Sequence, residues 1–143
     1  MTNTYKEFHQ KYNISKFKVY ENKNWIVSLR PEQKTPFSFL LTLKSDKNEL
    51  RSINEIEMVD LIESYNFIET LSYDKLGAIK VNYLCLMMVD SIVHYHVFPR
   101  FGKILKVREL TLKDQYFPKP VDMSDGKFIN LNDIVEILDF IKG

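Results

Sequence analysis

Apolar residues recur along this chain at two spacings, one typical of strands and one typical of helices. Five short segments that are rich in β-branched and aromatic residues, and bounded by turn residues, are predicted to be strands. They span residues 17–21, 25–30, 37–43, 79–88 and 93–100. The links between them are short wherever no helix intervenes, which favours antiparallel pairing.

Three segments have apolar residues at helical spacing, and they are predicted to be helices over residues 4–12, 56–71 and 131–141. Ser52 and Glu55 precede the long helix and are interpreted as a capping box. The apolar positions of this helix form one wide stripe, which predicts that it packs across a sheet. These positions are Ile56, Val59, Leu61, Ile62, Tyr65, Phe67, Ile68 and Leu71.

The order of the elements, with three strands, the long helix, two strands and a last helix, predicts an α+β domain. One sheet with a helix lying on it follows from this order. A length of 143 residues leaves room for one domain, over residues 1–143. Residues 102–127 are predicted to be a loop-rich tail, and the last helix is expected to have Asn130 or Asn132 as its N-cap.

Charge and cysteine content exclude several classes of protein. The chain has 20 Lys and Arg against 19 Asp and Glu, and therefore lacks the basic surface that nucleic-acid or membrane binding requires. The single cysteine, Cys85, cannot form an intramolecular disulfide. The first residues show no basic region followed by an apolar one, and no apolar run approaches the ~20 residues of a membrane span, so we expect a cytoplasmic protein.

The strand at residues 93–100, with the residues just before it, carries the candidate chemistry. His94 and His96 lie in it, two residues apart. Because side chains alternate along a strand, Ile92, His94, His96 and Phe98 are predicted to share one face, with the two imidazoles ~6–7 Å apart. A neutral imidazole held by a main-chain carbonyl can attack phosphorus, and a second imidazole can contact a phosphate oxygen or protonate the leaving group.

The spacing of the two histidines leaves three interpretations open. They could be structural residues of the strand without a chemical role. They could also be two ligands of a metal ion, with Asp90 or His9 as the third ligand. The third interpretation is nucleophilic chemistry on phosphorus.

The segment HYHVFPR at residues 94–100 resembles the signature strand of the histidine triad (HIT) family, in which histidines alternate with apolar residues before Pro-Arg. WIVSLRP at residues 25–31, with Gln33 and Thr35 after it, and NYLCLMMVD at residues 82–90 resemble bacterial HIT members of the diadenosine tetraphosphate hydrolase-like type. YFPKP at residues 116–120 is similar to a Trp-Pro-x-Pro element of those proteins.

The resemblance implies a HIT-like fold: a five-stranded antiparallel sheet with one long helix packed across it and a C-terminal helix. It also implies nucleotidyl transfer through a nucleotidyl-histidine intermediate, with His94 as the nucleophile and His96 as the phosphate contact or acid. The family's first histidine falls on Ile92, and the histidine that supports it in several members falls on Ser38. The glutamine loop that grips polyphosphate in many members is replaced by a segment with Asp90, whose charge is unfavourable there unless the carboxylate is turned away or paired with a cation.

Four further residues are candidates for substrate contacts. Arg30 and Gln33 follow the second strand, where the family contacts the nucleoside, and Ser28 belongs to the same segment. Asn82 lies on the strand expected beside the histidines, where its amide could reach a phosphate or a sugar, although it could equally close the sheet edge. For Arg100 we expect a structural ion pair.

The resemblance implies a hydrolase or nucleotidyl transferase that acts on a phosphoanhydride or phosphoramidate of a nucleoside monophosphate, such as a dinucleoside polyphosphate. This chemistry requires no cofactor, although magnesium would accompany a polyphosphate substrate. The alternatives are a nucleotide-binding HIT module with little or no turnover, and a metal-dependent hydrolase that uses both histidines. The expected partners are a nucleotide and a second copy of the chain in a homodimer.

Overall fold

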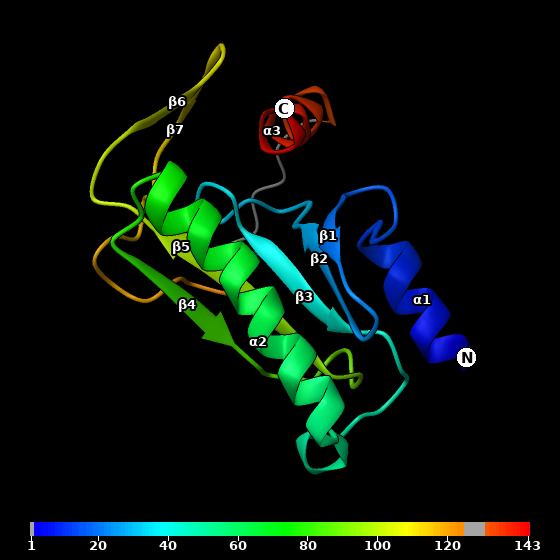
Figure 1. Cartoon of the computed structure of the whole chain (residues 1–143). Coiled ribbons are helices and arrows are strands. Elements are labelled where there is room, and N and C mark those ends of the chain that lie inside the picture. Colours follow the sequence, from blue (N-terminus) through cyan, green and yellow to red (C-terminus); the bar gives the residue numbers. More distant parts are fainter. Residues whose placement is uncertain (1, 125–130) are drawn as a thin grey trace.

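The computed structural model describes residues 2–124 and 131–143, and a five-stranded antiparallel sheet forms its centre (Figure 1). The sheet has the strand order β1-β2-β3-β5-β4. Its strands are β1 (Lys18–Glu21), β2 (Trp25–Leu29), β3 (Phe39–Leu43), β4 (Lys80–Leu84) and β5 (His94–Arg100). The α+β class and the antiparallel sheet are therefore confirmed, and the histidine strand lies between β3 and β4 rather than at an edge.

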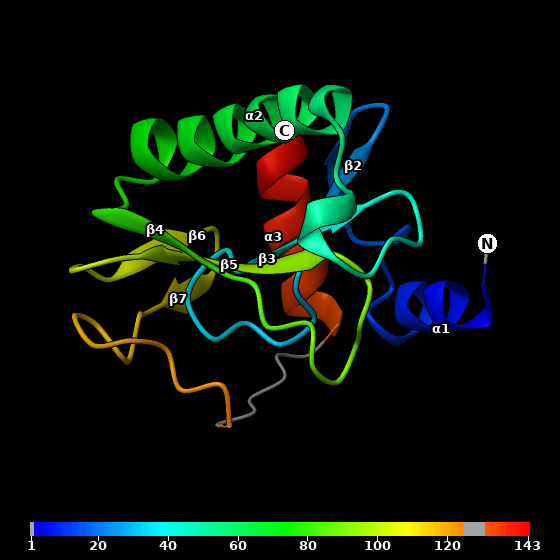
Figure 2. The same cartoon turned by 90° about the horizontal axis from the view of Figure 1, so that it is seen from below.

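Helices cover both faces of the sheet. Helix α2 (Glu55–Glu69) crosses one face, and helix α1 (Asn3–Lys11) lies on the opposite side (Figure 2). Helix α3 (Leu131–Lys142) contributes to the same core as α2. A 3-10 turn at Leu50–Ser52 precedes α2, and a π-helical turn at Thr70–Lys75 follows it.

The larger core lies between the sheet and helices α2 and α3. Alternate residues of the central strands point into it, as Val27 and Leu41 do at paired positions of β2 and β3. Leu61 and Ile68 of α2 cover this face. Trp25 is fully buried there, and its indole Nε1 donates a hydrogen bond to the main-chain carbonyl of Glu57 at 2.8 Å.

The capping box of α2 lies two residues later than the sequence predicted. Asn54 Oδ1 accepts from the Glu57 main-chain N–H at 2.8 Å, and Glu57 Oε1 accepts from the Asn54 N–H at 2.9 Å. The assignment to Ser52 and Glu55 is therefore wrong. Both pairs have a suitable spacing, but Lys47 forms an ion pair with Glu57 at 2.6 Å, which favours the later box through a tertiary contact.

The apolar stripe of α2 is narrower than predicted. Leu61 and Ile68 are buried against the sheet, whereas Ile56, Val59 and Ile62 are each more than half exposed. Helix α2 therefore presents a second apolar face to the solvent.

Helix α1 packs on the face of the sheet that carries the histidines. Tyr5 and Phe8 form a second, smaller core with Ile26 of β2, Leu40 of β3 and Ile92. The apolar spacing of residues 4–12 predicts the helix itself, and the structure adds that it covers the histidine face.

The segment expected to be a loop-rich tail contains a hairpin of two short strands, β6 (Leu105–Val107) and β7 (Leu110–Leu112). The strand expected over residues 79–88 ends at Leu84. Asn132 lies inside α3 and is not its N-cap, while Asn130 lies outside the described residues. None of the helices in the described residues is long and apolar enough to span a membrane.

Candidate active site

The two histidines of β5 lie next to each other on the sheet face covered by α1. In the strand register His94 pairs with Thr42 and His96 pairs with Leu40, both in β3. The imidazole centroids are 5.1 Å apart, and the residues are only 2% and 6% exposed. The intervening Tyr95 packs against the larger core on the other face. The predicted shared face of His94 and His96 is therefore confirmed.

A main-chain carbonyl fixes the proton on the His94 ring. Nδ1 of His94 lies 2.7 Å from the carbonyl oxygen of Ile92, and the bond requires that Nδ1 carries the proton. Burial lowers the pKa of His94, with the Ile92 carbonyl as a smaller opposing effect. The ring is therefore neutral near pH 7, and Nε2 carries a free lone pair.

Burial and a neighbouring cation also keep His96 neutral. Burial, followed by the charges of Arg30 and His94, lowers the pKa of His96 to about 3. Its Nδ1 is buried and has no hydrogen-bond partner among the described residues.

Arg30 is a buried cation of the same site. Its guanidinium lies 5.5 Å from the centroid of the Phe98 ring, and Nη1 donates to the Glu32 carbonyl at 3.1 Å. The Arg30 Nε is buried without a partner among the described residues. The guanidinium therefore keeps donors, Nε among them, that no described residue accepts from and that could bind an anion beside the histidines.

A pocket of about 260 Å³ opens beside the two histidines. Its remaining lining comes from the end of α1 (Lys11 and Tyr12), from Arg30, from the loop at residues 86–90 and from Met123. Segments far apart in the sequence therefore form this pocket together. A buried cation and two imidazoles in one cleft suit an anionic ligand such as a phosphoryl group.

Asp90 is paired with a cation, which is one of the two arrangements that the sequence left open for its carboxylate. Lys11 Nζ and Tyr12 Oη both contact Asp90 Oδ2, at 3.0 Å and 3.3 Å. The hydrogen bond to Asp90 raises the pKa of Lys11, so the lysine remains charged.

Of the four residues predicted as substrate contacts, the structure brings only Arg30 to this pocket. The Gln33 amide is engaged locally, because its Nε2 donates to the carbonyls of Arg30 and Ser38 at 2.7 Å and 2.8 Å. Ser28 is fully buried in β2, and Leu40 of β3 lies between it and His96, because Leu40 pairs with both residues in the strand register. Asn82 is exposed, and its Oδ1 accepts from Arg100 at 3.0 Å.

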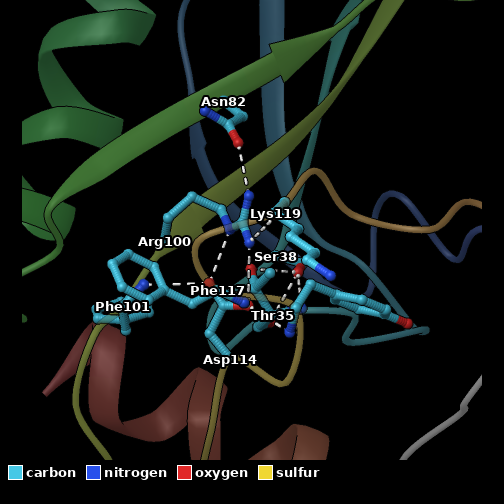
Figure 3. A network of polar contacts seen from close by, with 9 residues as sticks. Thr35, Ser38, Asn82, Arg100, Phe101, Asp114, Phe117 and Lys119 are labelled. Atoms are coloured by element: carbon cyan, nitrogen blue, oxygen red, sulfur yellow. Dashed lines mark hydrogen bonds and ion pairs between the residues drawn. The ribbon is translucent and has the colours of Figure 1, made fainter.

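Arg100 forms the structural ion pair that the sequence analysis expected. Its guanidinium points between Asn82 and the buried carboxylate of Asp114 (Figure 3), with Nε 2.7 Å from Asp114 Oδ2. Nη2 donates to the Lys119 carbonyl at 2.6 Å. This network attaches the segment after β7 to the end of β5.

Lys11, Tyr12 and Phe8 are the site residues that sequence reasoning missed. Phe8 packs its ring 4.7 Å from the His94 ring, centroid to centroid, and is one of the groups that bury it. The helical spacing of residues 4–12 was visible in the sequence. No local pattern indicates which face of the sheet that helix covers.

A metal site has no support in the described part of the chain. Within residues 2–124 and 131–143, no three His, Cys, Asp or Glu side chains gather as metal ligands. Neither Asp90 nor His9, the two third ligands that the sequence suggested, completes a cluster with the histidine pair among these described residues.

The sheet order, the helix across one face and the His-x-His strand at the centre define the class of this protein: the chain has the histidine triad fold. A histidine triad protein from Sinorhizobium meliloti superimposes with a TM-score of 0.68 at 16% identity, with 91% of each chain covered. No family model matches the sequence, and no curated protein matches it.

Two further similar structures belong to proteins whose names refer to nucleotides. A hypothetical histidine triad nucleotide-binding protein from Sulfolobus tokodaii has a TM-score of 0.62 at 14% identity, over 88% of this chain and 80% of that chain. The diadenosine triphosphate hydrolase of Plasmodium falciparum has a TM-score of 0.63 at 13% identity, over 98% of this chain and 95% of that chain. These similarities establish the fold.

Proposed function

We propose that this protein is a HIT-type nucleotide hydrolase or nucleotidyl transferase. Its substrate is a nucleoside monophosphate joined to a leaving group by a phosphoanhydride or phosphoramidate bond. The observation that carries the proposal is the 2.7 Å hydrogen bond between His94 Nδ1 and the Ile92 carbonyl, which leaves Nε2 free to attack. The fold that it shares with a diadenosine triphosphate hydrolase supports the same chemistry.

The reaction has two steps. First, Nε2 of His94 forms a bond to the α-phosphorus, and the bond from phosphorus to the leaving group breaks with its electron pair on the departing atom. A departing nitrogen also takes a proton from solvent. Then water attacks phosphorus, the bond to His94 breaks, one proton passes to solvent and the nucleoside monophosphate leaves. The scheme requires no metal, and magnesium would enter only with a polyphosphate substrate.

Neighbouring groups stabilise the charges that develop. The His94 adduct is a cation with its proton still on Nδ1, and the Ile92 carbonyl accepts from it. Neutral His96 retains one N–H that can donate to a phosphoryl oxygen, and buried Arg30 attracts the anion. A bound phosphate would raise the pKa of His96 from its resting value of about 3, so a role as acid depends on the ligand.

The isoleucine at the first triad position fits this scheme. Its main-chain carbonyl, and not a side chain, orients His94. The Ile92 side chain lies in the small core with Phe8 and Leu40, where it is 2% exposed. The position therefore keeps an orienting role through the backbone while its side chain contributes packing.

Mass spectrometry of protein quenched during turnover tests the nucleophile. With adenosine 5′-phosphoramidate or diadenosine triphosphate, we expect an adenylyl mass on the peptide that contains His94. His94→Asn should abolish both the adduct and the turnover, while His9→Gln is the matched control, because His9 packs against the Tyr5 ring and does not line the pocket. A His94→Asn protein with wild-type turnover would overturn the assignment.

The second candidate is a nucleotide-binding module with little turnover. The observation that favours it is the burial of His96, which is 6% exposed and has an unpartnered Nδ1 among the described residues, because burial lowers the pKa and a neutral ring is a weak acid for a leaving group. Calorimetry with adenosine 5′-monophosphate, run beside the turnover assay, separates the two functions. Tight binding with turnover no faster than that of His94→Asn would select the module.

The proposal includes a homodimer and keeps the cytoplasmic location expected from the sequence. The exposed apolar face of α2, with Ile56, Val59 and Ile62, supports the dimer because such faces mark contact surfaces. Sedimentation of the wild type and of Val59→Lys tests it. We expect a dimer for the wild type and a monomer for the variant, and a wild-type monomer at all concentrations would contradict the proposal.

A further inference from the structure

A carboxylate in the pocket wall opposes the charge of a phosphate ligand. Asp90 lines the pocket together with His94 and His96, and its side chain is 20% exposed. Solvent therefore screens its charge only in part. The negative charge of Asp90 raises the pKa values of His94 and His96. Burial has the opposite and larger effect on both pKa values.

Helix α1 holds this carboxylate in place. Lys11 and Tyr12, which are consecutive at the end of the helix, both contact the same oxygen, Oδ2 of Asp90. Lys11 is 48% exposed, so its charge is better screened than that of Asp90. Both partners of the ion pair line the pocket, but the Asp90 charge has the larger effect there because Lys11 is more exposed to solvent.

The rim beside Asp90 is apolar. Met88 and Val89, the two residues before it, are 85% and 88% exposed. The pocket volume of about 260 Å³ lies just below the ~300–1,000 Å³ of sites that enclose a drug-sized ligand. A leaving group that extends past this rim would meet aliphatic side chains, the Asp90 carboxylate and, among the described residues of the rim, one cation, the paired Lys11.

We propose that Asp90 selects the leaving group by charge, so that the site favours nucleoside monophosphoryl compounds with an uncharged or cationic leaving group, such as an amine, over polyphosphates. The inference rests on the proposed function and narrows its substrate class. Lys11 moderates the selection, and Arg30 attracts the one phosphoryl group that must lie beside His94.

Coulomb's law gives the size of the effect. One additional negative charge ~8 Å from the carboxylate, at an effective dielectric constant of ~20–30, changes an affinity about tenfold. Removal of the Asp90 charge should therefore raise the affinity for a ligand with two phosphates about tenfold, relative to the affinity for a ligand with one phosphate.

Calorimetry measures this selection without turnover. Adenosine 5′-monophosphate and adenosine 5′-diphosphate are bound to the wild type, Asp90→Asn and Lys11→Gln. We expect the ratio of the two affinities to shift about tenfold toward the diphosphate in Asp90→Asn and several-fold toward the monophosphate in Lys11→Gln. Glu49→Gln, which removes an equal charge from an exposed ion pair with Arg51, should leave the ratio at the wild-type value.

A further variant separates charge from folding. Tyr12→Phe removes a contact to Asp90 but no charge, so the ratio of affinities should remain at the wild-type value even if both affinities fall. An equal ratio in the wild type, Asp90→Asn and Lys11→Gln would overturn the inference. Failure of both nucleotides to bind the wild type would overturn it as well.

Turnover distinguishes this inference from the proposed function. Adenosine 5′-phosphoramidate and diadenosine triphosphate donate the same adenylyl group but release ammonia and a nucleoside diphosphate. Asp90→Asn should shift the ratio of kcat/KM values toward the triphosphate by about tenfold. If Asp90→Asn cleaves both substrates with the same ratio of kcat/KM values as the wild type, the inference about Asp90 is refuted while the hydrolase proposal stands. If neither substrate is cleaved but nucleotide binding still depends on the Asp90 charge, the hydrolase proposal is refuted while the inference stands.

Discussion

Replacement of Phe8 by alanine tests the packing of α1 against the histidine strand. The Phe8 side chain is 2% exposed and lies in the small core, with its ring 4.7 Å from the His94 ring and 5.0 Å from the Tyr12 ring. Deletion of a buried phenyl group removes its transfer free energy and leaves a cavity, which together cost ~3–5 kcal/mol. In a domain of this size the loss corresponds to a fall in Tm of about 10–15 °C.

The same substitution should change the titration of His94. Burial is the largest cause of the lowered His94 pKa, and Phe8 is one of the groups that bury the ring. Phe8→Ala admits water beside the imidazole, so the pKa of His94 should rise toward its ordinary value of ~6.5. NMR titration of the imidazole signals measures the shift, and urea denaturation measures the free energy of unfolding.

Phe140→Ala is the matched control for Phe8→Ala. Phe140 of α3 is 39% exposed and packs against Phe37, far from the histidines in the fold, so we expect a smaller loss of stability and no change in the His94 titration. A loss below ~1 kcal/mol for Phe8→Ala, with the His94 pKa unchanged, would refute the placement of α1 on the histidine face.

Three further predictions concern pH, a buried ion pair and a helix cap. The folded-state pKa of His96, about 3, lies below the unfolded value of ~6.5, so its contribution to stability is present above pH ~6.5 and lost as the pH falls toward 3. Urea midpoints between pH 5 and 7 should rise with pH more steeply in the wild type than in His96→Gln, and parallel curves would contradict the burial of a neutral ring. Arg100→Leu leaves the carboxylate of Asp114, whose side chain is 0% exposed, without its cation and should cost ~3–5 kcal/mol in denaturation experiments, while a loss near zero would refute a buried pair. Asn54→Ala should cost ~1 kcal/mol and Ser52→Ala close to nothing, and the reverse order would restore the capping box predicted from the sequence.

Local patterns in the sequence predicted the strands of the central sheet, the three helices and the shared face of the two histidines, but not the β6–β7 hairpin. Side-chain alternation in an extended strand is a property of the backbone, so the shared face of His94 and His96 could be derived before any tertiary contact was known. A main-chain carbonyl was expected to orient His94, and the structure shows that it belongs to Ile92. The resemblance to histidine triad proteins then supplied the sheet.

Where the sequence offered two equally good local patterns, only the tertiary structure showed which one the chain uses. Two capping boxes fit the sequence before α2, and the contact of Lys47 with Glu57 favours the later one. The apolar positions of α2 extend around more of the helix than one sheet can cover, so the pattern alone did not show that Ile56 and Val59 face solvent.

The charge of the candidate site also depends on the tertiary structure. The sequence alone determined that Asp90 stands beside the histidine strand, where its carboxylate would have to turn away or pair with a cation. Which cation it receives depends on helix α1, which brings Lys11 to it across 79 positions of the chain. Periodicity describes one element at a time, whereas the side of the sheet that a helix covers depends on the free energy of packing the whole chain.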